Sequence, residues 1–101
     1  MRYQKANPSR LNGSYHVGEI NVNYSTLVKC FGLPHGKGDG YKVDAEWFLE
    51  FEDGYVASIY NYKDGKNYLG KEGQAVVDIV EWNVGGFDRI VIDYIKDIVE
   101  R

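Results

Sequence analysis

The strongest constraint in this sequence is an alternation of apolar and polar residues that leads up to an Asp53-Gly54 pair and resumes after it. Apolar side chains at every second position place one face of a strand against a core. Asp-Gly is a favoured pair for a two-residue type I′ turn, because both positions of that turn need positive φ. The pattern therefore predicts a β-hairpin over residues 42–63.

A two-residue turn would also fix the register of this hairpin. The predicted cross-strand pairs are Phe51–Val56, Leu49–Ser58 and Trp47–Tyr60. One face, which carries Trp47, is then apolar and should meet the helices. The other face is then acidic, with Asp44, Glu46 and Glu50.

The predicted register leaves an apolar island on this acidic face, made of Phe48, Ile59 and Tyr55. Exposed apolar islands are typical of contact surfaces. We expect residues 1–12, the Tyr68–Leu69 pair or a second copy of the chain in a homodimer to cover it.

The other elements follow from periodicity and from residues that stop helices. Residues 14–22 read as an N-terminal strand, and Ser25 is a suitable N-cap for a short helix over residues 26–31. The pattern over residues 79–84 predicts a third strand that continues the hairpin into a β-meander. The pattern over residues 87–100 predicts an amphipathic C-terminal helix. The expected fold is α+β over a single domain, 1–101, with an antiparallel sheet, both helices on one face and an irregular N-terminal arm over residues 1–12.

The composition limits the possible partners. The 101 residues carry a formal net charge of −3 and no long basic run, so direct binding of duplex nucleic acid is not expected. The single cysteine, Cys30, excludes a disulfide framework. No stretch reads as a secretory leader or a membrane span, so we expect a cytoplasmic protein that does not bind membranes.

No residue pattern indicates a catalytic centre. His16 and His35 have no metal-ligand spacing, and no residue is placed to activate Cys30 as a nucleophile. The glycines over residues 36–40 lead into a strand, whereas a phosphate-binding loop leads into a helix. We expect no enzyme activity, no cofactor and no metal.

A second candidate site lies around Trp82-Asn83-Val84-Gly85-Gly86. Paired glycines before a helix can present backbone amides to an anion. A nucleotide could then stack on Trp47, Tyr60 or Trp82, with its phosphates at Gly85 and Gly86. An ordinary strand-to-helix turn explains the same residues.

Several segments together resemble a family of small bacteriophage proteins of unknown function. They are Lys42-Val43-Asp44-Ala45-Glu46-Trp47, Phe51-Glu52-Asp53-Gly54, Ile59-Tyr60-Asn61-Tyr62-Lys63, Trp82-Asn83-Val84-Gly85-Gly86 and Phe31-Gly32-Leu33-Pro34. The resemblance covers residues 25–86. Asn83 stands where the family would carry His, which argues against proton chemistry at this position. The resemblance implies a small protein that acts in a host cell against bacterial defence.

Three functional hypotheses follow from the charge, the absence of catalytic motifs and this resemblance. The first is a phage-encoded inhibitor, similar in role to anti-CRISPR proteins, that binds a bacterial host protein or ribonucleoprotein such as a CRISPR effector stoichiometrically. Its contact surface would be Asp44, Glu46, Glu50, Phe48, Ile59 and Tyr55. The second is a small-molecule binder that sequesters a signalling nucleotide, and the third is a small enzyme.

Overall fold

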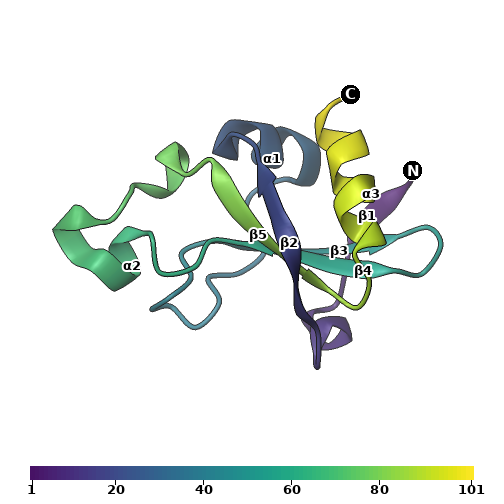
Figure 1. Cartoon of the computed structure of the whole chain (residues 1–101), viewed down its shortest axis with the longest axis horizontal. Helices are drawn as coiled ribbons and strands as arrows, with labels where there is room; N and C mark the ends of the chain where they lie inside the picture. The colour runs from purple at the N-terminus through teal and green to yellow at the C-terminus, as the bar shows by residue number, and fades with distance from the viewer.

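The chain folds into a five-stranded antiparallel sheet with the strand order β1-β3-β4-β5-β2 (Figure 1). The structure is a computed structural model, and it describes all 101 residues. The strands are β1 (Tyr3–Lys5), β2 (Tyr15–Asn21), β3 (Glu46–Phe51), β4 (Val56–Tyr60) and β5 (Glu81–Gly86). The helices are α1 (Tyr24–Phe31), α2 (Lys66–Leu69) and α3 (Ile90–Val99), with short 3-10 turns η1 (Pro8–Leu11), η2 (Gly70–Glu72) and η3 (Val76–Asp78). The predicted α+β class is confirmed.

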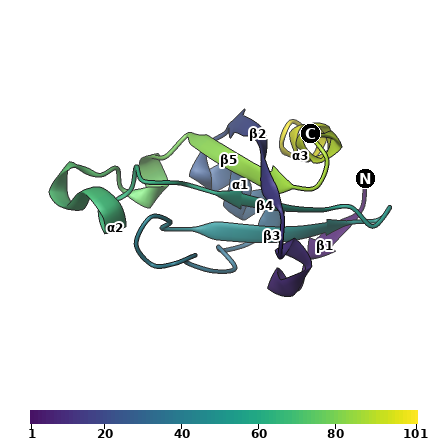
Figure 2. The ribbon, with the colours of Figure 1, turned by 60° about the horizontal axis from the view of Figure 1, so that its bottom comes forward.

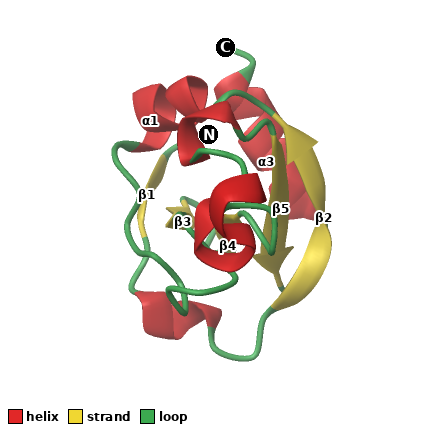
Figure 3. Ribbon diagram, turned by 90° about the vertical axis from the view of Figure 1, so that its left-hand side faces the viewer, coloured by secondary structure: helices red, strands yellow, loops and turns green.

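Helices α1 and α3 lie on one side of the sheet, and η1 lies on the other (Figure 3). Both long helices are amphipathic, so their apolar stripes face the strands. The main core forms between these two layers around Trp47, Trp82, Leu27 and Ile95, all of which are fully buried. None of the helices has the length and apolar character needed to cross a bilayer.

The hairpin between β3 and β4 closes with a three-residue turn, so the predicted two-residue turn is wrong. Gly54 N donates to Phe51 O, and Phe51 N donates to Tyr55 O, both at 2.9 Å. Gly54 has a φ of 92°, so it is the left-handed residue that completes such a turn. The longer turn moves the register by one residue and pairs Trp47 with Ile59 and Leu49 with Ala57.

The shift inverts the predicted faces of β4. Because side chains alternate between faces, a slip of one residue moves every side chain of a strand to the other side. Ile59 and Ala57 are therefore in the main core, while Tyr60 and Ser58 lie on the opposite face. Trp47 is buried against the helices, as predicted.

The N-terminal residues are not an irregular arm. Tyr3–Lys5 forms the edge strand β1, which pairs with β3, and η1 follows. Ala6 and Leu11 of this segment pack with Val56 and Phe48 in a second, smaller apolar cluster. The predicted island of Phe48, Ile59 and Tyr55 is therefore absent, and with it the reason to expect a homodimer.

Residues 61–80 form a lobe around α2 that projects from one end of the sheet (Figure 2). Asn61 is fully buried at the base of this lobe. Its side-chain oxygen accepts from the backbone N–H groups of Asp44 and Ala45, and its nitrogen donates to the carboxylates of Asp44 and Asp64. Asp44 also accepts from the backbone N–H of Asn67, so this network holds the lobe on the hairpin.

Candidate functional site

The face of the sheet opposite α1 and α3 carries two adjoining hollows. The first, of about 300 Å³, is lined by His16, Tyr60, Tyr62 and Asn83. The second, of about 450 Å³, shares Tyr62 and Asn83 and is otherwise lined by Asp64, Gln74, Val80 and Glu81. We call the two together the open-face groove. Its lining residues come from β2, β4 and β5 and from the segment between β4 and β5.

Strand register brings the groove residues together from three separate parts of the sequence. Asn83 of β5 lies between Tyr60 of β4 and Glu19 of β2. Gly85 lies between Ser58 of β4 and His16 of β2, next to the β-bulge that interrupts β2. The alternation that sends Trp82 and Val84 into the core directs these residues to the open face.

Gly85 and Ser58 are cross-strand partners on the open face, and the Ser58 side chain packs directly over Gly85. A methyl group on Gly85 would lie 2.6 Å from Ser58 Oγ and 3.5 Å from the Tyr60 ring. Ser58 is 5% exposed, and its hydroxyl makes no hydrogen bond within the chain. Every fully enclosed polar side-chain atom of the structure has a partner, so the Ser58 hydroxyl retains a small exposure to solvent.

Glu46 lies beside Tyr60 and has no partner for its carboxylate. It is half-buried and belongs to no ion pair or side-chain hydrogen bond. Burial, and secondarily the charge of Asp39, raises the pKa of Glu46 above its ordinary value. Burial and the neighbouring Glu46 charge in turn raise the pKa of the Tyr60 phenol. A carboxylate in this position favours the approach of a cation.

His16 borders the groove on the β2 side. Its Nε2 lies 3.2 Å from Asn83 Oδ1 and 3.4 Å from Glu19 Oε1, so it donates between two oxygen acceptors. At the other end, Lys63 Nζ lies 5.3 Å from the centre of the Tyr62 ring. The chain thus already places one lysine against a groove aromatic, while no Lys or Arg lines the hollow at Tyr60.

The acidic contact surface predicted from the sequence is divided by the structure. Glu46 remains on the open face beside Tyr60, but Glu50 forms a 2.8 Å ion pair with Arg10. Asp44 is engaged in the Asn61 network at the base of the lobe. Of the predicted apolar members, Ile59 is buried, Phe48 is covered by the N-terminal segment, and Tyr55 is exposed near the hairpin turn and packs against Tyr94.

The predicted nucleotide site is not assembled. Trp47 and Trp82 are fully buried, with their indole N–H groups donating to backbone carbonyls. Gly85 and Gly86 belong to β5, where they pair with residues of β4 and β2, and they do not form a turn. The side chain of Asp88 accepts from Ile90 N at the start of α3, which places a carboxylate where a phosphate would bind. Only Tyr60 remains available for stacking.

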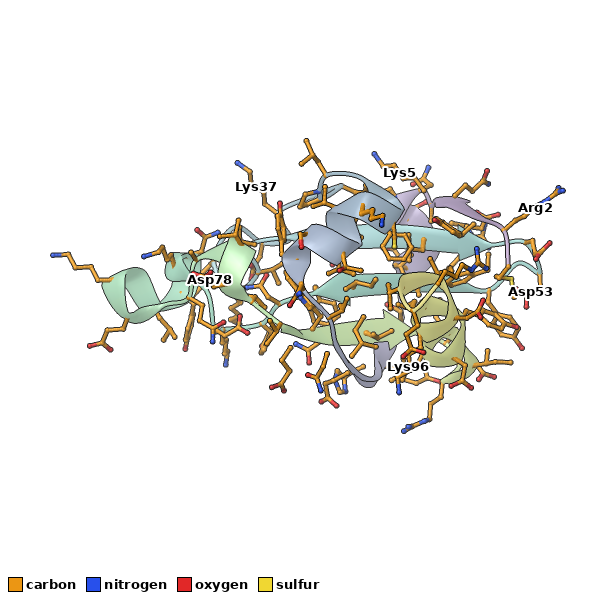
Figure 4. The ribbon with its side chains drawn as sticks, turned by 90° about the horizontal axis from the view of Figure 1, so that it is seen from above. Arg2, Lys5, Lys37, Asp53, Asp78 and Lys96 are labelled. Carbon is orange, nitrogen blue, oxygen red and sulfur yellow. The ribbon has the colours of Figure 1, made fainter.

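Outside the groove, charges of opposite sign are interspersed. Arg2 and Asp53 lie near one end of the molecule, and Lys37 and Asp78 lie toward the other (Figure 4). A hollow of about 410 Å³ beside α1 and α3 contains both Lys96 and Glu100. No group of three or more His, Cys, Asp or Glu side chains is placed to hold a metal ion. The two hollows of the groove are lined by Asp64 and Glu81 and by no Lys or Arg side chain.

Comparison with known proteins gives no independent guide. No protein-family model matches the chain, and no curated protein matches it. The geometry of the groove carries the functional argument instead. Tyr60 was a candidate from the sequence, but Tyr62, Asp64, Gln74, Val80 and Glu81 were not, and it is the shifted register that places Tyr60 on this face.

Proposed function

We propose that this chain is an interaction protein. It binds a basic segment of a partner protein in the open-face groove and acts by blocking that segment. The observation that carries the proposal is Glu46, a half-buried carboxylate without a partner beside the accessible Tyr60. Burying an unpaired carboxylate lowers stability, so its placement favours a role in binding.

The neighbouring groups support a cationic ligand. Glu19 and Glu81 lie on the same face, and neither pairs with Lys or Arg. Tyr60 and Tyr62 add aromatic faces that attract cations. Phosphate-bearing ligands would instead be repelled by these carboxylates. Charge complementarity of this kind also accelerates association with a basic surface.

The resemblance to small phage proteins suggests the biological setting. In that setting the partner is a bacterial defence component, such as a CRISPR effector. Part of its basic nucleic-acid-binding surface would be bound in the groove and so be blocked. The proposed inhibition is stoichiometric and has no turnover. It should therefore disappear when the protein is present far below the concentration of its target.

Calorimetry with a defined basic peptide tests the groove directly. The probe is an octapeptide of alternating Arg and Gly, titrated into the protein at low and at high salt. A variant with Glu19→Gln, Glu46→Gln and Glu81→Gln should lose most of the binding, and the parent should bind more weakly at high salt.

The matched control changes the same number of charges away from the groove. Glu72→Gln, Asp93→Asn and Glu100→Gln alter exposed residues that line neither hollow of the groove. Equal loss in both variants would show that net charge alone attracts the peptide, and the groove proposal would then be rejected.

A further inference from the structure

We infer that the second hollow of the groove, at the base of the α2 lobe, is a binding site for a lysine side chain. We call it the lobe hollow. It has a volume of about 450 Å³ and is lined by Tyr62, Asp64, Gln74, Val80, Glu81 and Asn83. The inference rests on the proposed function and names the basic side chain that the groove takes. The fixed walls of the hollow, its charge and its apolar surface support it.

The walls of the lobe hollow are held in place by contacts within the chain. Asp64 Oδ1 accepts from the side-chain nitrogen of Asn61 at 3.0 Å, and Asn61 is fully buried. The backbone N–H of Gln74 donates to the carbonyl oxygen of Asp64 at 2.9 Å, which closes the base of the lobe. The opposite wall, Glu81 and Asn83, belongs to β5. The polar groups are therefore positioned before a ligand arrives, which lowers the entropic cost of binding.

The charges of the lobe hollow are negative and uncompensated. Asp64 and Glu81 form no ion pair, and no Lys or Arg lines the hollow. The neighbouring Lys63 has its Nζ at 5.3 Å from the centre of the Tyr62 ring and 5.6 Å from that of Tyr68. Lys63 is thus held on the aromatic rings and not at the two carboxylates. The hollow therefore attracts a cation from outside the chain and repels an anion.

The remaining lining suits the alkyl stem of a lysine. Val80 is 51% exposed although it is apolar, and Tyr62 is also exposed. A lysine side chain covers apolar surface with its stem and keeps its ammonium group among polar groups.

The acceptors of the lobe hollow come from separate segments, with Asp64 and Gln74 in the lobe and Glu81 in β5. An ammonium group has three donors that point in different directions, so it can reach acceptors on both walls. The planar fork of an arginine instead matches a single carboxylate. The arrangement therefore favours lysine over arginine.

Three small probes test the identity of the bound group. The Nα-acetyl amides of lysine, arginine and norleucine are titrated separately into isotope-labelled protein, and the backbone amides of Asp64, Gln74 and Glu81 are followed by NMR. The lysine probe should bind about threefold more tightly than the arginine probe, because its donors reach both walls. Norleucine has the same four-carbon stem as lysine but no charge, so it should not bind measurably.

Two variants locate the binding. Asp64→Asn keeps the oxygen that accepts from Asn61 and removes the charge. Glu81→Gln removes the charge of an exposed side chain, so it keeps the test valid if Asp64→Asn disturbs the lobe. Each should weaken binding of the lysine probe about tenfold, because one charge-assisted hydrogen bond is lost. Glu72→Gln, in η2 of the same lobe, lines neither hollow and is the matched control that should bind like the parent.

The outcomes separate the lysine site from the proposed function. The lysine site is overturned if the arginine or norleucine probe binds as tightly as the lysine probe, or if Glu81→Gln binds the lysine probe like the parent. It is also overturned if the Arg-Gly octapeptide binds and the lysine probe does not, and the basic-segment groove then stands. An absence of binding by the lysine probe and by the octapeptide would overturn both.

Discussion

The two faces of this sheet are made by alternate residues of the same strands, yet they have opposite properties. On the helix-covered face, Trp47 and Trp82 are fully buried in edge-to-face contact, 5.4 Å between ring centres. Both indole N–H groups have carbonyl partners. On the open face, Glu46 and the Ser58 hydroxyl have none within the chain. One face is internally satisfied, while the other retains unused hydrogen-bonding capacity.

This difference separates stability from function along single strands. Glu46 and Trp47 are neighbours in β3, but substitutions at the two positions should affect different properties of the protein. Changes on the covered face should cost stability, since buried apolar area and paired groups are lost. Changes on the open face should cost little stability and should affect binding.

The largest expected effect is that of Trp47→Ala. The substitution leaves a cavity in the core and removes the donor to Gly32 O, so it should lower the free energy of unfolding by about 3–5 kcal/mol. Urea denaturation followed by circular dichroism measures this. Tyr62→Ala on the open face is the control and should change stability by less than about 0.5 kcal/mol. Similar losses in the two variants would contradict the contrast between the faces.

Asn61→Ala should have the next largest effect. It removes the acceptor of the Asp44 and Ala45 backbone N–H groups at a fully buried position. Each buried group left without a partner costs about 1–3 kcal/mol. Hydrogen exchange should accelerate at residues 44–45 and across the α2 lobe before it does so in α3. Uniform acceleration across the molecule would show that the network does not act locally.

The comparison also explains which parts of the fold were predictable. Regular alternation in β3 identified its buried face, and helix-stopping residues located α1, because these are local properties. The register was not predictable in the same way. Asp53-Gly54 suits a two-residue turn, but it also fits a three-residue turn in which only Gly54 adopts positive φ. In β4, Val56-Ala57-Ser58-Ile59-Tyr60 has no clear alternation that would have decided between the two.

The candidate site was less predictable because it depends on that register and on the strand order. β5 lies between β4 and β2, so the groove combines residues that are far apart in the sequence. Tyr62, Gln74 and Glu81 carry no functional signal when read alone. The acidic residues did carry one, but the sequence does not tell that Arg10 neutralises Glu50 or that Asp44 anchors the lobe. Glu46 alone keeps its predicted role as a candidate binding residue.

Glu46→Gln, on the open face, should change stability less than the two substitutions above. It should raise stability, whereas they lower it. The folded-state pKa of Glu46 is raised, so its carboxyl contributes most to stability below the unfolded-state value near 4.5 and loses that contribution as pH rises through the folded-state pKa. Glutamine does not ionise. The variant should therefore be more stable than the parent at pH 7.5, with a smaller difference at pH 4. A destabilised variant at pH 7.5 would mean that Glu46 has an internal partner.

The smallest expected effect concerns His35, whose ring stacks on Phe48 of β3. His35 Nδ1 accepts from Phe48 N at 3.0 Å, and Nε2 faces Phe31 O at 3.4 Å, so the folded chain holds the ring neutral. Burial is the main cause that lowers the pKa of His35 below 6.5; the charge of Lys5 also lowers it, while the contact with Phe31 O opposes the shift.

The sign of the resulting pH dependence follows from proton uptake. Between the folded-state pKa of His35 and 6.5, the unfolded chain binds more protons, so stability is complete above 6.5 and is lost as pH falls through the folded-state pKa. His35→Asn should remove this step, because an amide oxygen can accept from Phe48 N without titrating. The chain with His35 and the His35→Asn variant should both also carry Glu46→Gln, because ionisation of Glu46 changes stability with pH in the opposite direction. Urea midpoints measured from pH 8 to 5 should fall more steeply in the chain that keeps His35 than in the His35→Asn variant, and parallel curves would show that His35 does not couple this edge to pH.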